Sequence, residues 1–124
     1  MAKTFLITGA ILGLLAVAVG AFGAHALRST LEANQRVDTF ELASRYQFYH
    51  ALALTLLGLV MLQMPKQVWL EYSGYAFTLG IVIFSGSLYL LALSNVRWLG
   101  AITPIGGLAL IAGWLFMLIG IIKN

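Results

Sequence analysis

The residues best suited to chemistry in this 124-residue sequence are its two histidines, His25 and His50. His25 lies three residues before Arg28, and His50 lies five residues after Arg45. At a helical rise of ~1.5 Å per residue, both imidazoles fall within about 4–8 Å of one boundary between charged and uncharged sequence. An imidazole changes its charge near neutral pH, so this pattern indicates a binding site or a proton site at that boundary.

Other polar residues are expected to gather at the same boundary. Spacings of three or four residues place several of them on shared faces of a helix. The predicted polar pocket consists of His25, Arg45, Tyr46, Gln47, Tyr49, His50, Tyr89 and Thr103. Such a pocket would hold a small ligand, a lipid headgroup or a proton. The competing interpretation is that each imidazole is hydrogen-bonded to a carbonyl or hydroxyl group and only fixes the helices.

The sequence lacks the residues that metal sites, haem sites and common enzymes usually need. Two histidines without a carboxylate or cysteine at ligand spacing leave a metal shell incomplete, and the small residues beside them leave little room for haem. The chain has no cysteine, no Gly-x-Ser-x-Gly elbow, no His-Glu-x-x-His motif and no phosphate-binding loop. We therefore expect no cofactor and no metal, and the sequence leans against an enzyme.

The elements that position these residues must lie in a membrane. Hydrophobic residues make up 61% of the chain and charged residues only 9%, against about a quarter charged in soluble domains. Seven Lys and Arg plus four Asp and Glu, eleven in all, cannot cover a globule of this size, so most of the exterior must face lipid. The net charge of +3 is typical of membrane segments with basic flanks, and no nucleic-acid partner is expected.

The charged residues divide the chain into long uncharged stretches. These are residues 4–27, 46–65, 72–96 and 98–122. Because about 20 helical residues cross the hydrocarbon core, each stretch is long enough to span it. The sequence predicts an all-α fold, a single transmembrane domain over residues 1–124. Its four helices are expected at approximately residues 4–27, 39–63, 71–94 and 98–122.

One interfacial segment, about residues 28–42, is expected between the first two helices, because it mixes charged residues with spaced apolar ones. Asp38 followed by Glu41 resembles a capping box, which would start the second helix near Thr39. Glu41 and Arg45 are four residues apart and are expected to form an ion pair.

Four spans would place both termini on one side of the membrane. Lys3, Lys66 and Lys123 would lie on that side, and the four arginines on the other. The rule that cytoplasmic loops carry more Lys and Arg then favours cytoplasmic arginines, by a bias of one charge. Insertion in both orientations stays an alternative with so small a bias.

Small residues recur every three or four positions in the first and fourth predicted helices. The glycines predicted to pack helices together are Gly9, Gly13, Gly20, Gly106, Gly113 and Gly120. Stripes of this kind let backbones approach closely, which is how helices associate in lipid. We interpret them as helix–helix contacts.

Four segments, one per predicted helix, resemble a known family. They read GAFGAHA at residues 20–26, YQFYHAL at 46–52, FSGSLY at 84–89 and TPIGG at 103–107. Together they resemble the domain of unknown function 423 family, the YgdD/YwdK-like small four-helix membrane proteins. The resemblance covers nearly the whole chain and implies a multi-pass protein of the bacterial inner membrane. It implies no activity, substrate or cofactor.

Two classes of function follow from the sequence. The first is an accessory or structural membrane component that forms a homo-oligomer or packs in a larger membrane complex, with the lipid bilayer as its surroundings. The alternative is a small transporter or channel subunit for a small molecule, an ion or a lipid headgroup, working through the polar pocket. Four helices fill their own centre with side chains, so a transport pathway would need an oligomer or a cleft.

Overall fold

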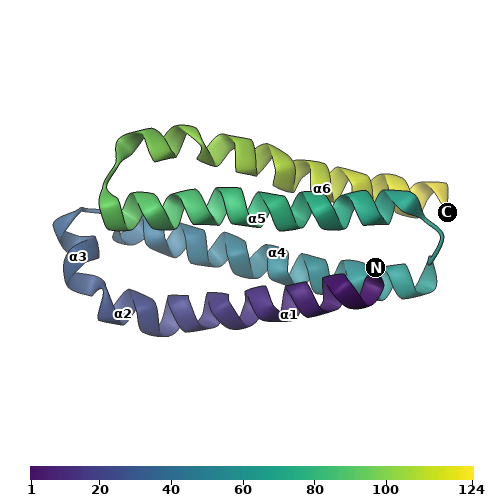
Figure 1. The fold of residues 1–124 in the computed structure, drawn as a ribbon, viewed down its shortest axis with the longest axis horizontal. Helices are drawn as coiled ribbons and strands as arrows, with labels where there is room; N and C mark the ends of the chain where they lie inside the picture. The colour runs from purple at the N-terminus through teal and green to yellow at the C-terminus, as the bar shows by residue number, and fades with distance from the viewer.

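The computed structural model describes residues 1–124 and contains helices but no strands (Figure 1). In chain order the helices are α1 (Ala2–Ala18), α2 (Ala24–Ala26), α3 (Arg28–Ala33), α4 (Val37–Gln63), α5 (Val68–Ser94) and α6 (Thr103–Lys123). A π-helical turn, Val19–Gly23, joins α1 to α2, and a 3₁₀ helix, Arg97–Ala101, precedes α6. The fold class is therefore all-α, as the composition predicts.

The long helices pack side by side in chain order: α1 against α4, α4 against α5, and α5 against α6. Both chain termini and the link between α4 and α5 lie at one end of the molecule, which we call the termini end (Figure 1). Helix α3 and the link between α5 and α6 lie at the other end, which we call the α3 end.

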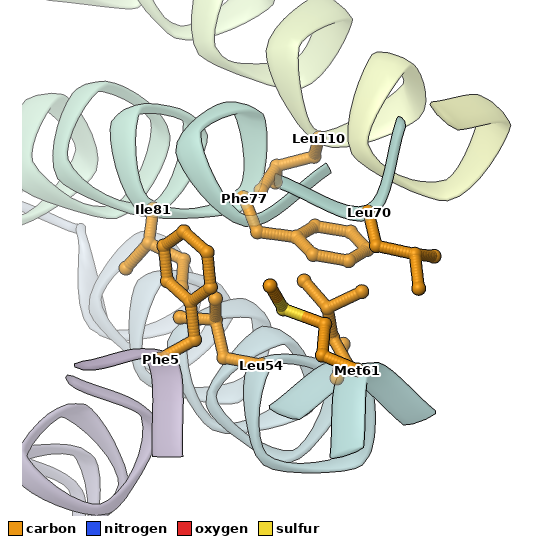
Figure 2. Close-up of a cluster of buried hydrophobic side chains, with 9 residues drawn as sticks. Phe5, Leu54, Met61, Leu70, Phe77, Ile81 and Leu110 are labelled. Carbon is orange, nitrogen blue, oxygen red and sulfur yellow. The ribbon is translucent and has the colours of Figure 1, made fainter. Parts of the chain in front are cut away.

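The main hydrophobic core lies where the four long helices meet toward the termini end (Figure 2). Phe5 of α1 contributes a ring that packs edge-on against Tyr75, with ring centroids 5.6 Å apart. The buried residues of this core are Phe5, Ala53, Leu54, Leu57, Met61, Leu70, Phe77, Ile81 and Leu110. Side chains from four helices therefore fill the centre of the bundle.

Glycines bring α5 and α6 into close contact. A Cβ added to Gly106 would lie only 2.7 Å from the Cα atom of Phe84, so it would clash with the backbone of α5. A Cβ on Gly113 would meet the Phe77 ring, and one on Gly120 would meet Leu70. Ser73 adds a hydrogen bond across this contact, donating from Oγ to the Gly113 carbonyl over 2.6 Å.

A second set of small residues packs α1 against α4. A Cβ on Gly9 would lie 2.9 Å from the Ala51 carbonyl oxygen, whereas one on Gly13 would make an ordinary contact of 3.8 Å with the Ala51 side chain. A Cβ on Gly20 would lie 2.5 Å from the Ser44 hydroxyl. All six glycines named from the sequence thus face a neighbouring helix of the same chain.

The segment between α2 and α4 folds back against the end of α5. Leu31 of α3 is buried with Phe40 and Ala92. The Asn34 side chain donates from Nδ2 to the carbonyl of Ala92 (3.0 Å) and to the next carbonyl. These carbonyls belong to the last turn of α5, where they have no partner within the helix.

The second helix starts within two residues of the predicted position, but the expected Asp38 cap and Glu41–Arg45 ion pair were both wrong. Helix α4 begins at Val37, and no side chain caps its first N–H groups. Asp38 lies inside the first turn, where its negative charge interacts favourably with the helix dipole but its side chain does not cap the helix. The expected Glu41–Arg45 ion pair is absent, and the one ion pair in the chain joins Arg28 to Glu32 over 2.8 Å.

Three helical stretches are long and apolar enough to cross a membrane, judged by length and composition: Ala2–Ala26, Val68–Ser94 and Arg97–Lys123. Helix α4 has the same length as α5 but does not qualify. The reason is that its first half carries charged residues and, further on, Gln47 and His50. Composition thus supports three of the four expected spans.

Candidate functional site

The polar residues of α4 between Arg45 and His50 point to different sides of the helix. Successive helical residues turn by about 100°, so a run of six cannot share one face. Gln47 and His50 face the interior, with 6% and 7% of their surfaces exposed. Arg45, Tyr46 and Tyr49 are exposed on the outside. The structure therefore divides these residues between the interior of the bundle and its outer surface.

Gln47 connects three helices through its side-chain amide. Its Nε2 donates to the Leu12 carbonyl of α1 over 2.9 Å. Its Oε1 accepts a hydrogen bond from the Tyr89 hydroxyl of α5 over 2.6 Å. Both ends of a buried amide are thus satisfied inside the bundle, as a polar group surrounded by hydrocarbon requires.

His50 connects α4 to α6. Its Nδ1 lies 2.8 Å from the Tyr46 carbonyl, which can only accept, so Nδ1 carries the proton. Its Nε2 lies 3.1 Å from Nε1 of Trp114, which can only donate, so Nε2 accepts. The two contacts together assign a neutral imidazole with one defined tautomer.

A groove of about 480 Å³ lies beside this contact, and we call it the α4–α6 groove. Its volume falls in the range of about 300–1,000 Å³ that is usual for ligand pockets. Tyr46 stacks on Phe84 at its wall, with ring centroids 4.9 Å apart. The lining residues are Tyr46, Tyr49, His50, Phe84, Gly107, Leu110, Ile111 and Trp114.

A second groove runs along the other side of α4, where it meets α1, the π-helical turn and α2. It consists of two adjoining hollows that share Gly20, Ser44 and Arg45, and we call it the α1–α4 groove. The lower hollow has a volume of about 280 Å³, and the upper hollow, nearer the α3 end, has a volume of about 210 Å³. Ser44 donates from Oγ to the Ala16 carbonyl, one turn before the π-helical turn, over 3.3 Å. Because Gly20 has no side chain, Ser44 can reach that carbonyl.

The remaining predicted pocket residues lie elsewhere. His25 is exposed on α2 and lines none of the four hollows, so the structure does not bring the two imidazoles into one pocket. Thr103 contacts Ser87 over 2.7 Å between their hydroxyl oxygens and joins α6 to α5. Outside the predicted pocket, the Glu32 carboxylate accepts a hydrogen bond from Nε of Arg28 over 2.8 Å and so raises the pKa of Arg28, but this exposed pair contributes little stability.

Sequence reasoning missed Ser44, Phe84, Gly107 and Trp114, which line the two grooves. A signal for Trp114 was present. An indole at the end of a span is satisfied by the interface, but Trp114 lies near the middle of α6, where its N–H needs an acceptor from a neighbouring helix. His50 is that acceptor.

Comparison with known proteins places the whole chain in one group. The family described as "Protein of unknown function (DUF423)" matches residues 19–107. A UPF0382 membrane protein of Staphylococcus haemolyticus is 45% identical over 121 residues, which cover 98% of this chain and 97% of the relative. The UPF0382 inner membrane protein YgdD of Escherichia coli K12 is 43% identical over 122 residues, covering 98% of this chain and 91% of the relative. No solved structure matches the chain. The chain is a membrane protein and belongs to the DUF423 family.

Proposed function

We propose that this protein is an accessory membrane component: a four-span bundle that associates, through the α4–α6 groove, with a transmembrane helix of a second copy or of a larger complex. The observation that carries the proposal is the combination of a filled interior with a groove that opens sideways. No buried side-chain nitrogen or oxygen lacks a hydrogen-bond partner. No hollow is lined by all four long helices.

The fourth span in this proposal is α4. Helices α1 and α5 both begin at the termini end and finish toward the α3 end (Figure 1). If both cross the bilayer, the chain between them must return across it, and only α4 in that range is long enough, at ~40 Å for 27 residues. Its inward polar side chains, Gln47 and His50, bond to neighbouring helices, which removes the cost of placing them in hydrocarbon.

The topology predicts a labelling pattern for single cysteines introduced into this cysteine-free chain. Ser29→Cys, Lys66→Cys and Asn124→Cys all replace exposed residues outside the long apolar stretches. With a membrane-impermeant maleimide on intact cells, we expect positions 66 and 124 to share one behaviour and position 29 to show the opposite one. If α4 does not cross, all three positions lie on the same side, and identical labelling of the three would contradict the fourth span.

Association through the α4–α6 groove is supported by its shape. Gly107 lies in the groove and leaves the backbone of α6 uncovered, so a helix from outside can approach closely. Tyr46, Phe84 and Trp114 supply aromatic surface around it. The transporter or channel alternative draws less support, because a path for a solute would need a cleft that these helices fill with side chains.

Filling the groove should abolish association. We expect Gly107→Leu to convert an oligomer or complex, observed by native mass spectrometry from nanodiscs, to the monomer. A Cβ at Gly107 meets only ordinary contacts of 3.8 Å, so the fold should be retained. The mass of the wild-type assembly then tells whether the occupant is a second copy or another protein.

Gly86→Leu is the matched control, because a Cβ there has nothing within 4 Å and Gly86 does not line the groove. It should leave the assembly intact. A wild-type protein that is already monomeric under these conditions, or equal effects of the two substitutions, would contradict the proposed association.

A further inference from the structure

The α1–α4 groove contains two opposite charges without partners in the protein. Arg45 and Glu41 are one helical turn apart on α4 and both line the upper hollow, which is nearer the α3 end. Neither makes an ion pair within 4 Å or a side-chain hydrogen bond in the structure. The one ion pair joins Arg28 to Glu32 on α3, and Glu41 attracts Arg28 only over a longer distance. Charges at this spacing ordinarily attract each other, so their separation leaves both free for a third group.

Arg45 lies at a depth where the groups that could neutralise its charge from outside the protein belong to membrane lipids. Arg45 lies at the level of Gly20, since both line the same two hollows. Gly20 is eight residues, or about 12 Å by helical rise, from Arg28, inside the uncharged stretch of residues 4–27. A guanidinium at that depth is costly unless it pairs or extends toward the interface.

Below Arg45 the groove becomes apolar. The lower hollow is lined by Ala16, Val17, Ala21 and Phe48, with the hydroxyl-bearing Tyr49 at its side. Tyr49 is one helical turn after Arg45 on α4 and lines the same hollow, and its hydroxyl makes no hydrogen bond within the protein. A ligand that fits the whole groove therefore needs a phosphate or carboxylate for Arg45, a cation for Glu41 and a long apolar part for the lower hollow.

From these features we propose that the α1–α4 groove binds a phospholipid with a zwitterionic, primary-ammonium headgroup. The phosphate lies at Arg45 and Tyr49, the ammonium lies at Glu41, and an acyl chain runs along Ala21 and Phe48. Free phosphate or a free headgroup would leave the apolar hollow empty, whereas a lipid fills both parts. This inference rests on the proposed four-span arrangement, which places the groove at the lipid boundary.

The test is competitive binding measured by native mass spectrometry on the purified full chain in mild detergent. The probes are phosphatidylethanolamine, phosphatidylglycerol and phosphatidylcholine with identical acyl chains, at equal concentrations. We expect the ethanolamine lipid to be the dominant adduct on the wild type. Arg45→Gln should lower that adduct roughly fivefold, which is the effect of one Lys or Arg facing an anionic group at a membrane surface.

Substitution of the acid gives the sharper result. Glu41→Gln should lower the ratio of ethanolamine to glycerol lipid adducts roughly fivefold, because the ammonium loses its carboxylate while the phosphate keeps Arg45. Asp38→Asn and Arg97→Gln change exposed charges at the same end that line no hollow, and they should leave both adducts unchanged. A ratio insensitive to Glu41→Gln, or equally sensitive to Asp38→Asn, would overturn the assignment.

A steric pair tests the apolar part with all charges retained. Ala21→Phe should fill the lower hollow and reduce adducts of all three lipids, whereas Ala18→Phe, on an exposed residue outside the groove, should not. Displacement of the lipid by millimolar glycerophosphoethanolamine would show a headgroup site and overturn the lipid assignment. Cysteine labelling and the Gly107 assembly assay are independent of these residues, so failure of lipid binding is distinguishable from failure of the proposed function.

Discussion

Gly106→Ala is expected to lower the melting temperature of the purified protein by about 10 °C. The added methyl group would lie 2.7 Å from the Cα atom of Phe84 and closer still to its backbone nitrogen, so α5 and α6 must separate. Overpacking against a backbone that cannot rotate away costs about 3 kcal/mol, and each kcal/mol corresponds to a few °C in a domain of this size. Differential scanning fluorimetry in detergent, or thermal loss of the monodisperse peak in size exclusion, measures the change.

The adjacent residue provides the control. A Cβ on Gly107 lies 3.8 Å from the nearest atoms of the Phe84 ring, so Gly107→Ala should change the melting temperature little. The two variants share the same change in helix propensity and the same lipid surroundings. A drop of similar size in both variants would show that the close approach of α5 and α6 at Gly106 does not limit stability.

The all-α membrane character could be predicted from the sequence because it depends on composition and length. Eleven charges in 124 residues leave long, continuously apolar stretches, which cross lipid as helices because a helix satisfies its own backbone hydrogen bonds. The glycine spacing indicated close helix contacts for the same reason, since a residue without a side chain at every third or fourth position makes one smooth face. The structure places those faces between helices of one chain.

The arrangement of the polar residues could not be predicted in the same way. Distance along a helix places Arg45 and His50 near one boundary, but the rotation of about 100° per residue sends them to opposite sides of α4. The buried stripe on α4 is formed by Phe40, Ala43, Gln47 and His50, which have helical spacing. Which neighbour each polar group meets depends on how α1, α5 and α6 are placed, and that is a tertiary property.

The π-helical turn likewise has no local signature in the sequence. Val19–Gly23 contains two glycines, which weaken an α-helix without specifying a wider turn, and the turn lies where Gly20 admits the Ser44 hydroxyl to the Ala16 carbonyl. Turns of this kind are often found at functional positions in helices. Here Gly20 and Ala21 of the turn line the α1–α4 groove together with Arg45 and Glu41 of α4.

Gln47→Leu is expected to destabilise the bundle by about 2 kcal/mol, because it leaves the Tyr89 hydroxyl inside the bundle without its acceptor. Leucine has nearly the same size, so packing around the site should change little. The Leu12 carbonyl loses its extra donor as well, which releases the contact of α1 with α4. The expected readout is a melting temperature lower by about 5 °C. Gln63→Leu, at the exposed end of the same helix, is the control and should have little effect.

Removing both partners separates the hydrogen bond from other effects of the substitution. In a Tyr89→Phe background the hydroxyl that Gln47→Leu would strand is already gone, so the second substitution should cost less than in the wild type. The coupling should be about 1 kcal/mol, near the upper range measured for hydrogen bonds between membrane helices. Strict additivity of the two single changes would mean that Gln47 stabilises the bundle through packing alone, and that the amide does not tie α5 to α4.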